Sequence, residues 1–202
     1  PRITAFLVDV GMPGFDIQVG YNCVSYRGYL NFKLDFDNVR LSPDHILGEE
    51  GRGLELSGKW LGMGRIWVGA TCCGKAERLF EMATSWAAER KQFGQAIGKF
   101  QATGFKLADM ATEVEAARLL VYKSAIDKDQ GKNFDQSSAM AKLYASKVAM
   151  EQTVEAVQIH GGYGFVKEYH VERLMRDAKI TQIYEGTSEV QKIVISRGVL
   201  KG

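Results

Sequence analysis

Proline is confined to the first 43 residues of this chain. The 202-residue sequence has three prolines, Pro1, Pro13 and Pro43, and residues 44–202 contain none. At the usual share of ~5%, about eight would be expected in a stretch of that length. Proline removes a backbone N–H and clashes with the preceding turn of a helix. The absence of proline therefore predicts that residues 44–202 are largely helical.

The spacing of apolar residues in this stretch is also helical. Apolar residues recur at steps of three and four, which places them on one face of a helix. One such set is Leu107, Met110, Val114, Ala117 and Val121, and a second is Met140, Leu143, Met150, Val154 and Val157. We expect helices near 54–90, 100–130, 135–160, 168–179 and 187–199. Their short connections favour an antiparallel bundle.

Residues 1–37 have the pattern of β-strands instead. Residues 3–10 are a nearly continuous apolar run that suits a buried strand, and apolar and polar residues alternate over 15–22 and 30–37. A period of two predicts half-buried strands. We expect three strands in a meander that is too small to be stable without a packing partner. The sequence thus predicts a mainly α protein, with a partial antiparallel β domain over 1–52 and a helical bundle over 53–202.

The charge and cysteine content exclude several classes of function. The 26 basic and 24 acidic residues are well mixed, which argues against nucleic acid as the main partner. No apolar run approaches the ~18 residues of a membrane-spanning helix. The three cysteines, Cys23, Cys72 and Cys73, are an odd set without metal-ligand spacing. They are typical of a reducing compartment and predict no metal site.

Residues 69–75 match the first seven places of a phosphate-binding P-loop. The eighth place, which is Ser or Thr in that motif because its hydroxyl binds magnesium, is Ala76 here. The segment also falls inside a helical period, where the helix uses the backbone N–H groups. We therefore expect its glycines to allow close packing of helices and not to bind a nucleoside triphosphate.

Glu185 is the candidate for catalysis. Ser188 and Gln191 have the spacing of a capping box for a helix that runs to about residue 196. This spacing puts Glu185 and Gly186 in the turn before a helix N-terminus. An apolar substrate that desolvates a carboxylate raises its pKa far more than a helix dipole lowers it. Such a carboxylate can take a weakly acidic C–H proton, although spacing alone also suits a solvated acid at a helix start.

Two further segments, 89–94 and 158–162, end predicted helices on glycine. Arg90 complements the negative end of the helix dipole, and Gly94 supplies a left-handed cap. His160 by itself is more often a capping or core histidine than a catalyst. Each segment taken alone therefore has a sufficient structural explanation.

Taken together, these segments resemble the acyl-CoA dehydrogenase family, flavoenzymes that desaturate acyl-CoA thioesters. The matching pieces, in family order, are 36–40, 47–48, 62–65, 89–94, 100–101, 158–164 and 176–189. The resemblance implies a C-terminal antiparallel helical bundle of the acyl-CoA dehydrogenase type, preceded by the last part of that family's middle β domain. Family members are about twice as long, so we expect a C-terminal part of such a chain or one half of a split protein.

The resemblance also implies a role for Glu185. Its carboxylate would remove the α-proton of the thioester while the β-hydrogen leaves as hydride to FAD. Its backbone N–H, together with a ribityl hydroxyl of the flavin, would stabilise the developing enolate. Some relatives carry the base on the first long helix, at the place of Gly64 here. Glu185 therefore has no rival as the base.

Binding residues follow from the same positional match. The implied FAD contacts, chiefly across a subunit boundary, are Arg90, Gln101, Gln158, Gly161 and Gly162, with Thr187 and Glu189 beside the base. Arg65 and Gly186 would border the acyl-CoA. Gly62 stands where many relatives have an aspartate. The implied partners are acyl-CoA, an electron-transfer flavoprotein and further copies of the chain in a tetramer or dimer, in the cytoplasm or, in a eukaryote, the mitochondrial matrix.

Two alternatives remain open at this level. The chain could be a non-catalytic helical oligomerisation fragment that does not hold flavin alone. It could also be an acyl-CoA oxidase, which shares the fold and passes electrons to oxygen, although residues 184–189 favour a dehydrogenase. The acyl-chain length is not predicted, because Trp60 and Trp67 on the first long helix suit either the core or the wall of a substrate pocket.

Overall fold

The computed structural model describes residues 2–201 of the chain, without the side chain of residue 201. It forms two compact units that meet between Leu61 and Gly62. This border lies inside the longest helix, α1 (Gly53–Glu89). The domains expected from the sequence, 1–52 and 53–202, stay a prediction.

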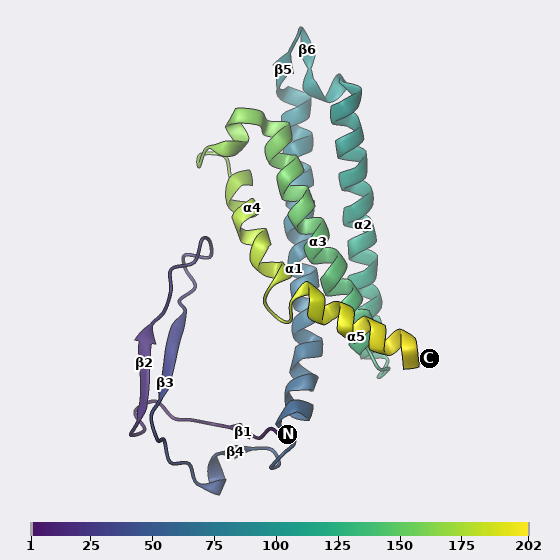
Figure 1. Ribbon diagram of the computed structural model, residues 1–202. Coiled ribbons are helices and arrows are strands. Elements are labelled where there is room, and N and C mark those ends of the chain that lie inside the picture. The colour runs from purple at the N-terminus through teal and green to yellow at the C-terminus, as the bar shows by residue number, and fades with distance from the viewer. Residues whose placement is uncertain (1, 202) are drawn as a thin grey trace. The chain divides into compact units, whose positions relative to one another are not determined.

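The second unit is the expected helical bundle. After α1 come α2 (Gln101–Asp129), α3 (Asp135–His160), α4 (Val171–Lys179) and α5 (Ser188–Lys201). The three long helices run alongside one another, and α3 packs against α2, α4 and α5 (Figure 1). All five predicted helices are confirmed, with ends that differ by no more than three residues. Among residues 2–201, no helix has the length and apolar character needed to cross a bilayer.

The bundle core is rich in small side chains, which pack among larger ones such as Leu79 and Met110. Alanines such as Ala76, Ala117 and Ala145 are almost fully buried among the long helices. A Cβ built on Gly69 would lie 2.9 Å from the side chain of Val121 in α2. Gly69 therefore allows α1 and α2 to approach closely, as predicted, and the segment that resembles a P-loop lies inside α1.

A short hairpin follows α1 where the sequence predicted a glycine cap. Strand β5 (Lys91–Gln92) pairs with β6 (Gln95–Ala96). Phe93 and Gly94 have φ values of 50° and 82°, which two-residue hairpin turns with positive φ at both central positions require. The prediction of Gly94 as the helix cap is wrong, because its left-handed conformation closes this hairpin. Three short 3-10 turns, Ile97–Lys99, Gly161–Phe165 and Ile180–Gln182, connect the helices.

The first unit contains two separate two-stranded ladders. Strand β1 (Ala5–Phe6) pairs with β4 (Ile46–Leu47), and β2 (Phe15–Val19) pairs with β3 (Phe32–Phe36). The predicted three-stranded meander is wrong, because β1 pairs with β4, which follows the three predicted strands in the chain, and not with β2. A 3-10 turn (Pro43–His45) precedes β4.

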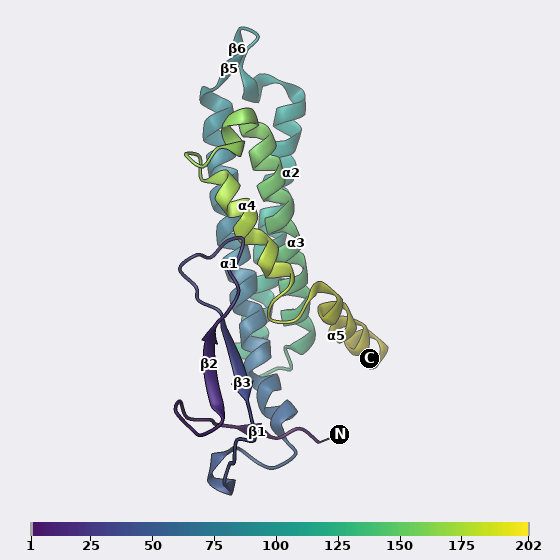
Figure 2. The same ribbon diagram turned by 60° about the vertical axis from the view of Figure 1, so that its left-hand side comes forward.

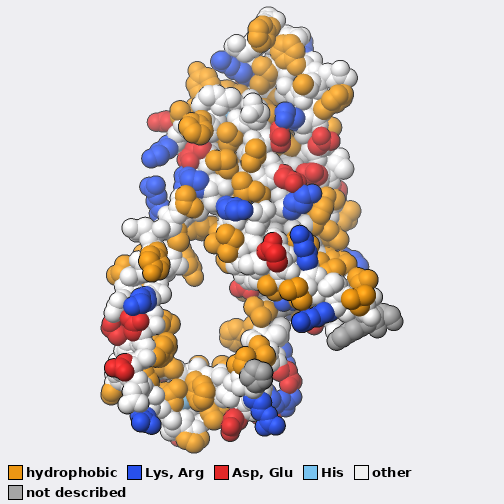
Figure 3. Space-filling view, in the orientation of Figure 1, with side chains coloured by type: hydrophobic (Ala, Val, Ile, Leu, Met, Phe, Trp, Pro, Cys, Tyr) orange, Lys and Arg blue, Asp and Glu red, His pale blue; other side chains and the backbone are white. Residues whose placement is uncertain are grey.

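The apolar residues of these ladders are largely open to solvent. Val10 is 80% exposed and Val19 87%, so the expected buried and half-buried strands are not found. Apolar side chains are visible on the surface of the β2–β3 ladder, where they are coloured orange (Figure 3). These side chains stay exposed because each ladder has only two strands, and the described residues of this unit form no further sheet or helix layer that covers them (Figure 2).

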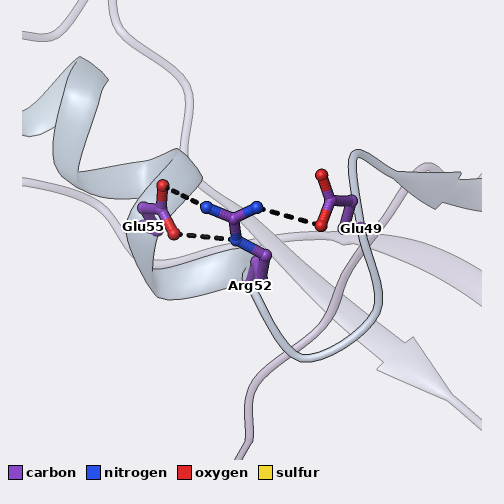
Figure 4. A network of polar contacts seen from close by, with 3 residues as sticks. All are labelled: Glu49, Arg52 and Glu55. Carbon is purple, nitrogen blue, oxygen red and sulfur yellow. Dashed lines mark hydrogen bonds and ion pairs between the residues drawn. The ribbon is translucent and has the colours of Figure 1, made fainter.

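Charged residues hold the start of α1. The Arg52 guanidinium donates to Glu55 at 2.7 and 2.9 Å and to Glu49 at 3.0 Å (Figure 4). These two carboxylates raise the pKa of Arg52 above its usual value. All three side chains are more than half exposed, so the network orders the entry into the helix and adds little stability.

Candidate active site

Glu185 lies in a strained turn between α4 and α5. Glu185 and Gly186 have φ values of 53° and 87°. The left-handed conformation costs a residue with a Cβ roughly 1–2 kcal/mol. Such residues persist only where their surroundings hold them, and they cluster at functional sites. The turn therefore singles out Glu185 among the described acidic residues, since it is the only one of them with a positive φ.

The Glu185 side chain lies against α1 at a glycine. A Cβ built on Gly64 would lie 2.8 Å from Cδ of Glu185. Real Cβ atoms essentially never come this close, so any other residue at this position would displace the carboxylate. Gly64 thus provides the space in which the Glu185 carboxylate rests.

The helix after Glu185 is capped by Thr187. The Thr187 hydroxyl accepts a hydrogen bond from the Val190 backbone N–H at 3.4 Å. The carboxylate of Glu189 accepts from its own backbone N–H and from the Thr187 hydroxyl, which lowers the pKa of Glu189. The predicted capping box of Ser188 and Gln191 is wrong, because the helix is capped one residue earlier and the Gln191 side chain is engaged elsewhere.

Two buried residues that sequence reasoning missed hold the turn from inside. Lys142 on α3 and Gln191 on α5 are both fully buried. The Lys142 ammonium donates to the Gly186 carbonyl at 2.7 Å, and the Gln191 amide donates to the carbonyls of Gly186 at 2.8 Å and Glu185 at 3.1 Å. A lysine on the apolar face of a predicted helix is the one sequence signal that could have pointed to this arrangement.

Arg65, predicted to border the substrate, is buried beside this turn. It is 9% exposed, and its Nε has no hydrogen-bond partner among the described residues. Burial lowers the pKa of Lys142, and the charge of Arg65 adds to that change. A buried guanidinium with a free N–H fits a site that takes an oxygen acceptor from a ligand.

A second group of predicted residues lines a cavity of about 570 Å³ near the β5–β6 hairpin. Arg90, Gly161 and Gly162 line it together with Trp86, His160 and Tyr163. The Arg90 guanidinium lies 5.3 Å from the centre of the Tyr163 ring. Gln158 is exposed at the end of α3, and Gln101 is exposed at the start of α2, outside the lining of the cavity.

His160 in this cavity wall has a structural role. Its ring stacks on Trp86 with centroids 5.0 Å apart, and its Nδ1 lies 2.7 Å from the Ala156 carbonyl. Burial lowers the pKa of His160. A buried, packed imidazole agrees with the capping or core histidine that the sequence favoured.

The two groups of predicted residues are far apart on one chain. Gly64 and Glu89 are 25 residues apart on α1 (89 − 64), which at ~1.5 Å per residue is about 37 Å. The Glu185 turn lies at Gly64, and the Arg90 cavity begins where α1 ends. The structure therefore does not bring the predicted flavin-binding residues together within one chain.

A family model described as the C-terminal domain of acyl-CoA dehydrogenases matches residues 51–200. This match covers most of the chain. The chain belongs to the acyl-CoA dehydrogenase family. The helical bundle and this family membership confirm the predicted fold class.

Individual relatives match nearly the full length of this chain. The short-chain-specific acyl-CoA dehydrogenase of Clostridium acetobutylicum is 44% identical over 98% of this chain and 52% of its own length. A subunit of the caffeyl-CoA reductase–Etf complex of Acetobacterium woodii is 43% identical over the same shares. The solved butyryl-CoA dehydrogenase of Megasphaera elsdenii is 47% identical with a TM-score of 0.92, over 98% of this chain and 51% of that one. The chain thus spans about half the length of the curated relatives it matches.

Proposed function

We propose that this chain supplies the base and part of the flavin site of an FAD-dependent acyl-CoA dehydrogenase, which introduces an α,β double bond into an acyl-CoA thioester. The single observation that supports this proposal most is the strained Glu185 turn. A carboxylate held in a costly conformation, over a glycine that leaves it room, is arranged for a task other than folding.

Glu185 acts as the base in this proposal. Its carboxylate takes the α-proton of the thioester, and a buried apolar acyl chain makes it a stronger base by desolvation. Within the described part of the chain, the Glu185 backbone N–H has no acceptor. It is therefore free to donate to the thioester carbonyl, where negative charge develops. Bound FAD supplies the acceptor for the β-hydrogen, which leaves as hydride.

The cavity at the end of α1 fits part of a flavin dinucleotide. Arg90 offers a cation to the diphosphate, and a Cβ built on Gly161 or Gly162 would meet nothing within 4 Å. The indole N–H of Trp86 in the same wall is buried without a partner among the described residues. We assign Arg90, Gly161 and Gly162, which line this cavity, to this part of the FAD site. Gln158 and Gln101 lie outside the lining and are added to it from the family resemblance alone.

Thr187 and Glu189 would bind FAD next to the base, about 37 Å along the bundle from the first part of the flavin site. Two copies of the chain, one contributing each part, would then surround one FAD. This separation supports the homo-oligomer, tetramer or dimer, that the family resemblance implies.

The substrate and the electron acceptor are proposed from the site and the relatives. Arg65 and Gly186 would border the acyl-CoA beside the base. Relatives named for short-chain acyl-CoA or butyryl-CoA make short-chain thioesters the first to test. The relative that belongs to a complex with Etf supports an electron-transfer flavoprotein as the acceptor. The location in the cytoplasm or mitochondrial matrix stays a prediction.

Replacement of the base tests this function. In the flavin-loaded protein, Glu185→Gln should keep FAD bound but slow flavin reduction by butyryl-CoA about 100- to 10,000-fold, because a general base contributes that much. Stopped-flow absorbance of the flavin measures the rate. Glu168→Gln, an exposed acid in the loop before α4, is the matched control and should react like the parent protein. Undiminished reduction by Glu185→Gln would show that the base lies elsewhere.

The two alternatives make different predictions for the same preparation. A non-catalytic helical fragment would stay colourless after incubation with FAD and gel filtration. An acyl-CoA oxidase would consume oxygen at the rate at which it oxidises the thioester. The proposed dehydrogenase is yellow and passes electrons to an electron-transfer flavoprotein faster than to oxygen.

A further inference from the structure

The Glu185 turn depends on groups from two other parts of the bundle. Its two carbonyls, those of Glu185 and Gly186, accept hydrogen bonds from the buried side chains of Lys142 and Gln191. Three donated hydrogen bonds thus fix two consecutive peptide groups. With the carbonyls held inside, the Glu185 side chain is left on the side that faces Gly64.

Lys142 is an unusual residue to find at this depth. Its side chain is fully buried, and an ammonium group carries three donors. Among the described residues, the Gly186 carbonyl is the one acceptor to which Nζ donates a hydrogen bond. Burial lowers the pKa of Lys142, whereas the nearby Cys72, Glu185 and Glu189 oppose that change. A buried cation with one acceptor is costly to the fold, so its presence calls for an explanation beyond packing.

Gln191 supports the same two carbonyls from α5. Its Nε2 bridges them, while its Oε1 is buried without a partner among the described residues. A Cβ built on Gly186 would lie 2.6 Å from that Nε2, so the close approach of the amide requires glycine at position 186. The left-handed turn, the glycine and the amide therefore depend on one another.

We propose that Lys142 and Gln191 are positioning residues, which hold the Glu185–Gly186 turn in its left-handed form so that the carboxylate stays over Gly64. The inference rests on the proposed function, because it gives the two residues a task only if Glu185 is the base. Neither residue is expected to touch the substrate. Both act through the backbone of Glu185.

Lys142→Met tests this role, since it keeps the length of the side chain and removes the ammonium. In the flavin-loaded protein, kcat with butyryl-CoA should fall about 10- to 100-fold, because a misplacement of ~1 Å costs that much, while KM changes less than threefold. The isotope effect for substrate deuterated at Cα should rise, because proton abstraction becomes slower. Lys147→Met is the matched control: Lys147 lies on the same helix with a side chain 58% exposed, and its variant should behave as the parent protein.

Hydrogen exchange gives a readout that does not depend on flavin or turnover. In Lys142→Met, the hydrogen-bonded amides on either side of the turn, those of Tyr184 and Gln191, should exchange at least ~10-fold faster, as expected for the loss of a hydrogen bond to a charged donor. The amides in the middle of α2 should be unchanged. Lys142→Gln, which keeps a shorter polar donor, should recover part of the rate and part of the protection.

The possible results separate this inference from the proposed function. If Glu185→Gln is inactive but Lys142→Met keeps its kcat and its exchange pattern, the positioning role is refuted and the base assignment stands. If Glu185→Gln is fully active, the proposed function itself fails. If Lys142→Met does not fold, Gln191→Met decides by the same measurements, because it removes the other donor to the same carbonyls. Unchanged kcat and exchange in that variant would equally overturn the proposal.

Discussion

Gly64→Ala should damage catalysis without damaging the fold. The added Cβ would lie 2.8 Å from Cδ of Glu185, whereas ordinary contacts begin at 3.4 Å. The carboxylate must therefore retreat by at least 0.6 Å (3.4 − 2.8). A shift of this order at a reacting group costs roughly 10- to 100-fold in rate. The group that moves is the end of a flexible side chain and not the backbone, so the helices need not separate.

The effect on stability should have the opposite sign. Alanine inside a helix is more favourable than glycine by roughly 0.5–1 kcal/mol. The melting temperature of Gly64→Ala should therefore equal or exceed that of the parent protein, while its rate of flavin reduction falls about 10- to 100-fold. Stopped-flow absorbance and thermal denaturation measure the two quantities on one sample.

Gly74→Ala is the matched control on the same helix. A Cβ built on Gly74 meets nothing within 4 Å, so this variant should gain stability and keep its full rate. If Gly64→Ala reduces flavin within twofold of the control, the carboxylate does not need the space over Gly64. The placement of the base argued from this contact would then be wrong.

Arg90→Gln should raise the Kd for FAD at least ~10-fold, because a charge-assisted hydrogen bond is worth about 1.5–3 kcal/mol. Flavin fluorescence titration measures the Kd, and an unchanged value would remove Arg90 from the flavin site. Burial lowers the pKa of His160, so the unfolded chain binds its proton more readily, and stability should fall as the pH drops below ~6.5. His160→Gln should flatten the dependence of Tm on pH between about 7 and 5. His170→Gln, an exposed control, should leave it unchanged.

The helices were predictable because their signal is local. Apolar residues at three- and four-residue steps and the lack of proline after Pro43 depend only on neighbours along the chain. The strand pairing was not predictable, because β1 pairs with β4 across about 40 residues and no sequence pattern specifies that partner. The hairpin at Phe93–Gly94 was missed for a related reason: a left-handed phenylalanine has no propensity signal.

The Glu185 turn was also predictable only in the part that depends on residues close by in the sequence. The sequence placed Glu185 before a helix N-terminus, which is where it lies. The contacts that support this position come from α1 through Gly64 and from α3 through Lys142. Which helix faces the turn is decided by packing of the whole bundle, so neither residue could be linked to Glu185 from spacing. Likewise, Arg90 and Gly161 meet in one cavity only because α1 and α3 end on the same side of the bundle (Figure 1).

Exchange of the substrate's α-hydrogens tests the role of Glu185 most directly. The flavin-loaded protein is incubated with butyryl-CoA in deuterated water, and mass spectrometry follows the incorporation of deuterium at Cα. We predict incorporation with the parent protein and with Glu168→Gln, and a loss of about 100-fold or more with Glu185→Gln. Incorporation by Glu185→Gln at the parent rate would contradict the assignment of Glu185 as the base.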